Sequence, residues 1–264
     1  MTDERQRLLE AVRQLVETEL LLGGDFLPRR RNELPEPGHA SSPAAGADSS
    51  GALDPRQKAQ ALAALEAQHV QECANCGLRR SCSRIVFGEG RPDAEIVFVG
   101  EAPGEEEDRQ GRPFVGRAGQ LLDRMIAAMG LRRRDVYICN MVKCRPPGNR
   151  TPTPEEVAAC WSYLVRQLQI IGPKVIVTLG NPATQGLLNI KTGITQLRGQ
   201  WQKLPAIGQG LEGIPVMPTF HPAYVLRQYN QETRGKVWDD LQKVMKLLGL
   251  KMPQRPAEGP DRLS

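Results

Sequence analysis

Four short runs of apolar residues are spaced along this chain, and sequence with helical features separates each run from the next. The runs are EIVFVG at 95–100, VYICNMV at 136–142, VIVTLG at 175–180 and VMPTF at 216–220. Strands that are buried on both faces read as near-continuous apolar runs, and parallel strands are joined by helices. The pattern therefore predicts an α/β fold, a three-layer sandwich in which helices flank a central, mainly parallel four-stranded sheet.

Helices are predicted where apolar residues recur every three or four positions and where capping residues stand at the start of a segment. Asp54 caps and Pro55 opens a helix that runs into Cys73, and its apolar face is predicted to contain Leu62, Leu65 and Val70. Thr153 begins a capping box with proline at the first helical position. The other predicted helices are 117–129, 154–171, a short one that begins at Asn181, and 232–248, with Val237, Leu241, Val244 and Leu248 facing inward.

The two ends of the chain differ in composition from the part that carries the strands. Residues 1–22 predict an amphipathic helix, which is either weakly anchored or a docking helix for a protein partner. Residues 23–53 are rich in Pro, Ala, Gly and Ser and are expected to form a disordered linker. The sequence thus predicts one domain at 54–250, followed by a flexible tail at 251–264.

Charge and hydropathy narrow the function classes only modestly. The net charge is +5 and the pI is about 9.0, which suits binding to nucleic acid without establishing it. No apolar run approaches the roughly 20 residues that cross a bilayer. Since the N-terminus also has no signal-peptide core, we expect a cytoplasmic monomer that does not associate with membranes.

Six cysteines in a chain expected to be cytoplasmic favour metal or redox chemistry over disulfides. Cys73 and Cys76 form a Cys-x-x-Cys pair, and Cys144 and Cys160 follow. Four thiolates can hold an iron–sulfur cluster or zinc, and the spacing does not separate the two. Cys139 is expected to be a buried hydrophobic residue. Cys82 is a possible substitute ligand, and a coincidence of unrelated cysteines is the alternative.

Unusual residues follow each predicted strand, and the carboxyl ends of parallel strands are where sites form in such sheets. They are the glycine-rich segment that begins at Gly100, Asn140, Gly180-Asn181 and His221-Pro222. The first segment has no phosphate-loop pattern, and its EEED run would repel phosphate. That run could bind a cation, order water or form a solvated helix start. Phe114 is either a core residue or a stacking platform for a base.

Five segments, taken in order, resemble the motifs of the family 4 uracil-DNA glycosylases. They are CANC, GEAPGEEEDRQGRPFVGRAGQLLD, YICNMVKCRPPGNRTPTPEEVAAC, VIVTLGNPA and TFHPAYVLR, and the resemblance covers roughly residues 57–248. It implies a uracil-DNA glycosylase-like fold and a hydrolase that flips uracil out of single- or double-stranded DNA. Cleavage of the N-glycosidic bond would leave an abasic site, which is the first step of base excision repair.

The resemblance also implies roles for individual residues. It assigns a [4Fe–4S] cluster to Cys73, Cys76, Cys144 and Cys160, leaving Cys82 out. Phe114 would stack on the extruded uracil, and the Asn140 amide would read its Watson–Crick edge. Backbone amides at Glu101–Gly104, including Ala102 and Gly104, would hold the remaining carbonyl. His221 would donate a hydrogen bond to uracil O2 as the bond breaks.

The group that activates water departs from the pattern of the best-known relatives, which carry an aspartate where this chain has Ala102. Glu101 or Glu107 is predicted to take that part, with Asn140 helping to position the water. For DNA contacts, phosphates could be met by Arg145, Arg150, Arg198 and Arg227, and Tyr224, Val225 or Leu226 could wedge into the base stack. The Arg132-Arg133-Arg134 run is predicted to be a solvated loop.

Three alternatives remain open from the sequence. A relative that traps uracil-DNA covalently would carry a histidine in a basic insertion after the second strand, and residues 143–152 contain none. A redox protein that uses the cluster would show a ferredoxin-like cysteine run or a cofactor fingerprint, and neither is present. An iron–sulfur DNA-binding module without catalysis would not require Phe114, Asn140 and His221 together.

Overall fold

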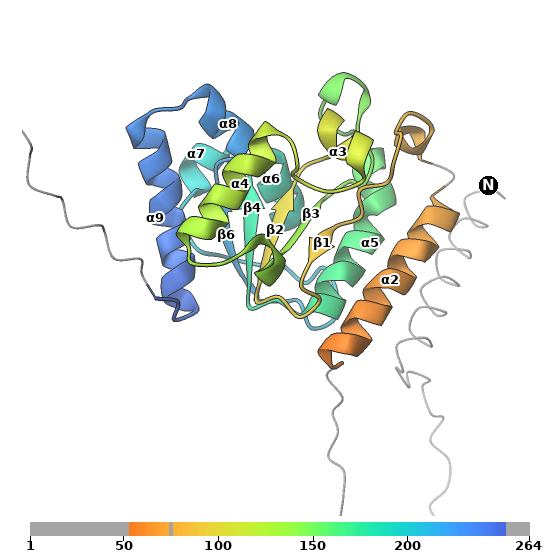
Figure 1. The fold of residues 1–264 in the computed structure, drawn as a ribbon, viewed down its shortest axis with the longest axis horizontal. Helices are drawn as coiled ribbons and strands as arrows, with labels where there is room; N and C mark the ends of the chain where they lie inside the picture. Colours follow the sequence, from red (N-terminus) through yellow and green to blue (C-terminus); the bar gives the residue numbers. More distant parts are fainter. Residues whose placement is uncertain (1–52, 74–75, 252–264) are drawn as a thin grey trace, which may run out of the picture. The chain divides into compact units, whose positions relative to one another are not determined.

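The computed structural model describes residues 53–73 and 76–251, and its centre is a six-stranded sheet (Figure 1). The strand order is β1-β3-β2-β4-β6-β5, in which the four inner strands run parallel and the two edge strands run antiparallel to them. The strands are β1 (Glu89–Gly90), β2 (Ile96–Gly100), β3 (Tyr137–Asn140), β4 (Val175–Leu179), β5 (Gln202–Lys203) and β6 (Pro215–Thr219). The predicted four-stranded parallel sheet is confirmed, and two edge strands are added. Each edge strand has two residues, too few to leave a periodic pattern in the sequence.

The five helices that the sequence predicted lie close to their predicted positions, and three short helices, Glu105–Gln110, Ile194–Leu197 and Pro222–Arg227, are added. Asp54 caps α2 (Pro55–Glu72) and Thr153 caps α5 (Pro154–Ile171), each through a capping box, and Gly172 ends α5 with φ +59°. The helices are α2 (Pro55–Glu72), α3 (Glu105–Gln110), α4 (Arg117–Ala128), α5 (Pro154–Ile171), α6 (Asn181–Leu188), α7 (Ile194–Leu197), α8 (Pro222–Arg227) and α9 (Gln231–Leu247). Short 3₁₀ turns occur at Gly77–Arg80, Arg133–Asp135 and Pro147–Asn149.

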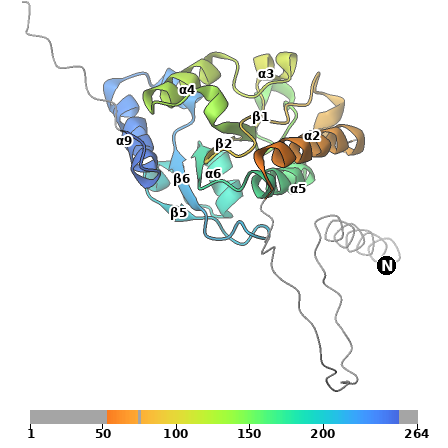
Figure 2. The same ribbon diagram turned by 60° about the horizontal axis from the view of Figure 1, so that its bottom comes forward.

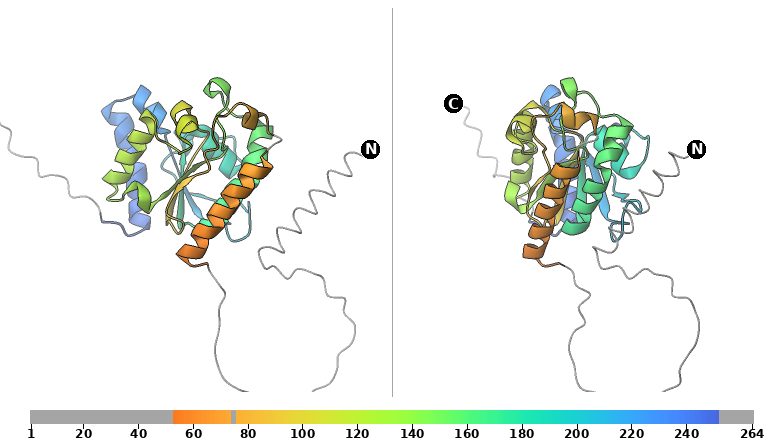
Figure 3. Two further views of the ribbon diagram at one scale, coloured as in Figure 1. Left: turned by 45° about the vertical axis from the view of Figure 1, so that its right-hand side comes forward. Right: turned by 90° about the vertical axis from the view of Figure 1, so that its right-hand side faces the viewer.

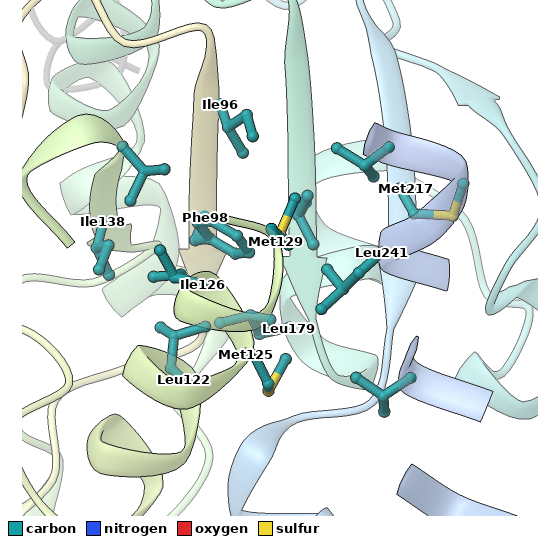
Figure 4. Close-up of a cluster of buried hydrophobic side chains, with 14 of the residues drawn as sticks. Ile96, Phe98, Leu122, Met125, Ile126, Met129, Ile138, Leu179, Met217 and Leu241 are labelled. Carbon is teal, nitrogen blue, oxygen red and sulfur yellow. The ribbon is translucent and has the colours of Figure 1, made fainter. Parts of the chain in front are cut away.

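Helices cover both faces of the sheet, which confirms the three-layer sandwich (Figures 2 and 3). Alternate residues of each strand point to opposite faces, so the sheet has two separate apolar cores. On one face Phe98 and Met217 meet α4, α8 and α9, as the cluster in Figure 4 shows. On the other face Val97 and Ile176 meet α5 and α6, and α2 packs outside α5. The strands are therefore buried on both sides, as their apolar composition requires.

The buried face of α2 differs from its prediction at one position. Leu62 and Leu65 are buried as expected, but Val70 is 50% exposed and His69 is fully buried. Positions 62, 65 and 69 are three or four residues apart and share one helix face, whereas position 70 lies off that face. His69 contacts the ring of Tyr163 edge-on, with the centroids 4.2 Å apart. Whether residue 70 is buried is therefore decided by its angular position around the helix axis, not by the hydrophobicity of valine.

The remaining expectations about the chain ends lie outside the described residues. These are the N-terminal helix at 1–22, nearly all of the linker at 23–53 and nearly all of the tail at 251–264. Within residues 53–73 and 76–251, no helix combines the length and the apolar character that a membrane span needs.

Candidate active site

A cleft of ≈ 630 Å³ opens at the carboxyl ends of the parallel strands, where α3, α6 and α8 begin. In Figure 1 this is the edge of the sheet along which α3 and α8 lie. We call it the strand-end cleft. It brings together all seven residues that were predicted for catalysis and substrate binding, namely Glu101, Ala102, Gly104, Glu107, Phe114, Asn140 and His221. Asn140 ends β3 and His221 follows β6, while the other five residues lie in the segment 101–114 that follows β2; the parallel topology is what gathers them.

Asn140 is the last residue of β3 and is paired with Gly100 of β2. Its side chain is almost fully buried, yet neither Oδ1 nor Nδ2 has a hydrogen-bond partner among the described residues. A buried amide without partners is unfavourable by about 1–3 kcal/mol per unsatisfied group, so such a group invites a ligand. The amide presents one donor and one acceptor to the strand-end cleft, as the edge of a base would require.

Phe114 lies in the loop between α3 and α4 with φ +49°, a left-handed conformation that is rare for an aromatic residue. Its ring forms a wall of the cleft, and its centroid is 5.6 Å from that of His221. A Cβ atom at Gly119 would overlap the Phe114 carbonyl, so glycine at that position is what allows the loop to approach α4. The Phe114 ring packs among core residues and also forms a wall of the cleft. Its position is therefore compatible with both roles that the sequence left open, a core residue and a stacking platform.

Glu107 holds two backbone segments of the cleft together. Its Oε2 accepts a hydrogen bond from the Gly104 amide at 3.1 Å, and its Oε1 accepts from the Val115 and Gly116 amides at 2.8 Å each. Both carboxylate oxygens are therefore engaged with the backbone. This arrangement favours a role for Glu107 in shaping the loops rather than in activating water.

Glu101 follows β2 and has a different environment. Its Oε1 is buried and has no hydrogen-bond partner within the described residues. Burial raises the pKa of the Glu101 carboxyl above its usual value, and a hydrogen bond from Thr151 opposes that rise. Glu101 also lines a second cleft, of ≈ 820 Å³, beside Trp161 and Pro182. Of the two glutamates predicted to activate water, Glu101 has the oxygen that is available.

His221 caps α8, and its Nδ1 accepts a hydrogen bond from the Ala223 amide at 3.0 Å. An Nδ1 that accepts a hydrogen bond leaves the proton of a neutral imidazole on Nε2. Burial lowers the pKa of His221 to about 4, with repulsion from Arg227 adding to the shift and attraction from Glu107 opposing it. At neutral pH the ring is therefore uncharged and offers an Nε2–H donor.

The lowered pKa of His221 predicts a measurable titration. We expect its ring to remain neutral, as the Nε2–H tautomer, down to pH 5, and to protonate with a midpoint at about pH 4. Because an unfolded histidine titrates near pH 6.5, the unfolded chain binds this proton first, and the contribution of His221 to stability falls as pH drops from about 6.5 toward 4. Nitrogen chemical shifts of labelled histidine, assigned with His221→Gln, test this. A midpoint near 6.5 would contradict the burial argument.

The cysteines form a separate buried cluster with Leu78 and Val142, and Ala102 of the strand-end cleft packs against it. Its members are Cys73, Cys76, Cys144 and Cys160, with Cys82 packed against them and partly exposed. Burial raises the pKa of the Cys73 thiol to about 11 and also raises that of Cys160. Across residues 53–73 and 76–251, no three His, Cys, Asp or Glu side chains are arranged to hold a single metal ion.

The two spare cysteines behave differently. Cys139 is fully buried in β3, as predicted. The Cys82 sulfur lies 2.7 Å from that of Cys144, so this residue stays close enough to compete as a ligand.

The arginines that were considered for phosphate contact are not equivalent. Arg150 and Arg227 line the strand-end cleft, although Arg150 also pairs with Glu156. Arg145 is held by Asn149 at 2.8 Å. Arg198 is wrongly placed for DNA, because it pairs with the fully buried Asp240 and lies beneath the Phe220 ring. Arg198 stays with Asp240 instead of lining the cleft, because a buried carboxylate without a partner is strongly unfavourable.

Of the three residues considered as a wedge, one is suitably exposed. Tyr224 is 37% exposed and lines the cleft, whereas Val225 is buried in the core and Leu226 packs against it.

Two residues that sequence reasoning missed are also revealed. Lys143 is fully buried and donates to the Asn140 carbonyl at 2.8 Å. Arg133 is only 18% exposed and binds the Phe114 loop, so the prediction of a solvated loop is wrong for this residue.

Comparisons with known proteins show which sequences this chain is similar to. The sequence model of the Uracil DNA glycosylase superfamily matches residues 87–242. A type-4 uracil-DNA glycosylase of Thermotoga maritima is 50% identical over 186 residues, which are 69% of this chain and 92% of that protein. One from Archaeoglobus fulgidus is 46% identical over 70% of this chain and 93% of its own length. One from Sulfurisphaera tokodaii is 46% identical over 68% and 82%, respectively. The matched region contains the strand-end cleft in full.

Proposed function

This chain belongs to the type-4 group of the uracil-DNA glycosylase superfamily, and from that membership we propose that its strand-end cleft binds uracil extruded from DNA and is where the N-glycosidic bond is hydrolysed. The enzyme is a hydrolase, and its product is an abasic site. The observation that carries the assignment of the cleft is Asn140, whose buried amide has both polar atoms unpartnered within the described residues. Uracil supplies the N3 hydrogen and the O4 acceptor that would satisfy them.

Discrimination against cytosine follows from the polarity of that amide. Uracil presents a donor at N3 and an acceptor at position 4, whereas cytosine presents the opposite pair. Cytosine would leave both polar atoms of Asn140 facing groups of like polarity, an unfavourable arrangement in a buried site. Phe114 would contribute stacking, which is tolerant of base identity. In this proposal Asn140 supplies the specificity and Phe114 supplies the affinity.

Bond cleavage places negative charge on the departing uracil and positive charge on the sugar. The Nε2–H of His221 would donate to uracil O2, and a neutral donor suits this task because it needs no proton transfer to act. The backbone amide of Ala102 would help to hold a uracil carbonyl, whereas the Gly104 amide donates to Glu107 Oε2 and does not serve this part. Glu101 would orient the attacking water, since its Oε1 is unpartnered while both oxygens of Glu107 are hydrogen-bonded to the backbone.

We propose that the cysteine cluster holds a [4Fe–4S] centre, with Cys73, Cys76, Cys144 and Cys160 as its ligands. What supports this is the burial of these four thiols in one cluster, together with the hydrogen bond from the Lys143 amide to Cys160. Backbone donors to sulfur are common around iron–sulfur centres. When bound, the centre would brace the segment from 144 to 160 through Cys144 and Cys160 at its two ends, and would connect it to Cys73 and Cys76. That segment includes Arg150 and Asn149, which line the strand-end cleft.

The ligand set can be tested by counting iron. We expect the wild-type chain to contain about four irons with acid-labile sulfide and to absorb visible light. Cys144→Ser should lower both counts because it removes a proposed ligand, whereas Cys82→Ser should retain them. Cys139→Ala is the matched control, since Cys139 is buried in β3 away from the cluster. Loss of iron in Cys82→Ser but not in Cys144→Ser would show that the proposed set is wrong.

Engagement of DNA is proposed from the rim of the cleft. Arg150 and Arg227 would meet phosphates on either side of the flipped nucleotide, and Tyr224 would enter the base stack. We further propose that one chain acts alone on its uracil-containing DNA. The contacts of Arg150, Arg227 and Tyr224 would not depend on the DNA sequence, because specificity resides inside the cleft rather than at its rim.

The deciding experiment follows abasic-site formation by the purified full chain on an oligonucleotide with a single uracil. Alkali-labile cleavage at uracil, and none in a thymine-containing control, is expected. Asn140→Ala should weaken cleavage roughly tenfold or more, because an unpaired buried uracil edge is unfavourable by about 1–3 kcal/mol. Gln120→Ala removes an exposed carboxamide from α4 and should change nothing. A chain with its full iron content that leaves uracil in place would overturn the proposal.

A further inference from the structure

The conformation of Phe114 requires restraint from its surroundings. Its φ of +49° is sparsely populated for residues with a Cβ atom and is unfavourable by about 1–3 kcal/mol. The ring nevertheless forms a wall of the strand-end cleft beside His221. A free loop would relax toward negative φ and carry the ring away from the cleft. Something must therefore hold the backbone on either side of Phe114.

Two charged side chains hold the loop 113–116 from opposite sides. Glu107 accepts hydrogen bonds from the Val115 and Gly116 amides. Arg133 donates to the carbonyl oxygens just before them, with Nη1 3.0 Å from the Phe114 oxygen and Nη2 bonded to the Pro113 oxygen. The loop's amides are thus held by an anion and its carbonyls by a cation, which is the favourable pairing in each case.

Arg133 is itself held in a fixed orientation. Its Nη1 lies 2.9 Å from an Asp123 oxygen on α4, and its Nε lies 3.3 Å from Glu89 of β1. The guanidinium therefore connects an edge strand, a helix and the Phe114 loop. The planar fork of arginine can make these bonds at once, whereas the single ammonium of lysine cannot. Its neighbours differ, because Arg132 pairs with Asp135 at the surface and Arg134 is exposed.

We propose that Arg133 is a positioning residue for uracil excision, which keeps the Phe114 ring in its stacking position by holding the carbonyls of Pro113 and Phe114. Arg133 does not line the strand-end cleft, so its influence passes through Phe114. The inference rests on the proposed function. It also gives Arg133 a part in the reaction that is separate from contact with DNA phosphates, which is the usual expectation for an arginine in a basic run.

The test compares Arg133→Met with Arg134→Met, which removes the same charge one position away. Arg133→Met should lower kcat/KM for uracil excision by about 10- to 100-fold, because a displacement of about 1 Å in a group that orients the substrate can lower the rate by that much. Arg134→Met should leave it unchanged. Arg133→Lys keeps the charge without the fork and should show an intermediate loss. If Arg133→Met does not fold, Arg133→Lys provides the test of the proposed positioning role. Wild-type activity in Arg133→Lys would overturn the inference.

A double-mutant cycle separates positioning from general stabilisation. In a Phe114→Ala background there is no ring left to place, so adding Arg133→Met should reduce kcat/KM by less than about twofold. An equal loss in both backgrounds would show that Arg133 acts elsewhere and would overturn the inference. If the wild-type chain does not excise uracil, the proposed function itself fails. If it does and Arg133→Met matches Arg134→Met, only the inference about Arg133 fails.

Discussion

Replacing His221 with asparagine is expected to lower kcat for uracil excision by about 10²- to 10³-fold, the usual loss when one donor to a developing anion is removed. Asparagine is a good helix N-cap, so its Oδ1 can take over the bond that Nδ1 accepts from the Ala223 amide. The variant therefore removes the Nε2–H donor while leaving the start of α8 intact. Single-turnover rates on saturating uracil DNA would isolate this effect from product release.

The complementary variant is His221→Gln, in which the cap is lost but an amide can reach the position of Nε2. We expect it to be more active than His221→Asn and less stable, by about 1 kcal/mol for the missing cap. Thermal unfolding of both variants, together with their single-turnover rates, would verify that the more active variant is the less stable one. If His221→Asn turned over at the wild-type rate, the hydrogen bond to uracil O2 would have no part in catalysis.

Replacing Gly100 with alanine should abolish most activity by a purely steric route. A Cβ at this position would lie 2.6 Å from the Phe114 Cζ and closer still to the Asn140 Oδ1, so both cleft residues would have to move. Since displacement of about 1 Å can lower the rate 10²-fold, we expect kcat/KM to fall by at least about 100-fold. The overpacking should also lower the free energy of unfolding by about 1–3 kcal/mol.

Gly235→Ala provides the matched control. Gly235 lies within α9, where an added Cβ would meet nothing within 4 Å. Alanine is about 1 kcal/mol more favourable than glycine inside a helix, so this variant should be slightly more stable and fully active. Steady-state kinetics and thermal unfolding of the two variants make the comparison. Normal kcat/KM in Gly100→Ala would mean that Phe114 and Asn140 do not need their observed positions.

Much of the scaffold was predictable because its signals are local. The apolar runs marked the four parallel strands, and Thr153 placed the start of α5 through a capping box that involves neighbouring residues. The convergence of Glu101, Asn140 and His221 was also predictable, since parallel strands end at the same edge of a sheet. The resemblance to family 4 uracil-DNA glycosylases then supplied an expected use for each residue, and the comparisons confirmed the family.

Only the tertiary structure distinguished residues whose local sequence is alike. Nothing in the run Arg132-Arg133-Arg134 marks the middle residue as the one that binds the Phe114 loop, because its partners lie 10 to 44 positions away in the sequence. Arg198 likewise pairs with Asp240, 42 positions away. The sequence by itself determined the four parallel strands, the longer helices and the edge at which the site residues meet, since these depend on local periodicity and capping. The choice of partner for each charged side chain was decided by the packing of distant segments, which local patterns do not encode.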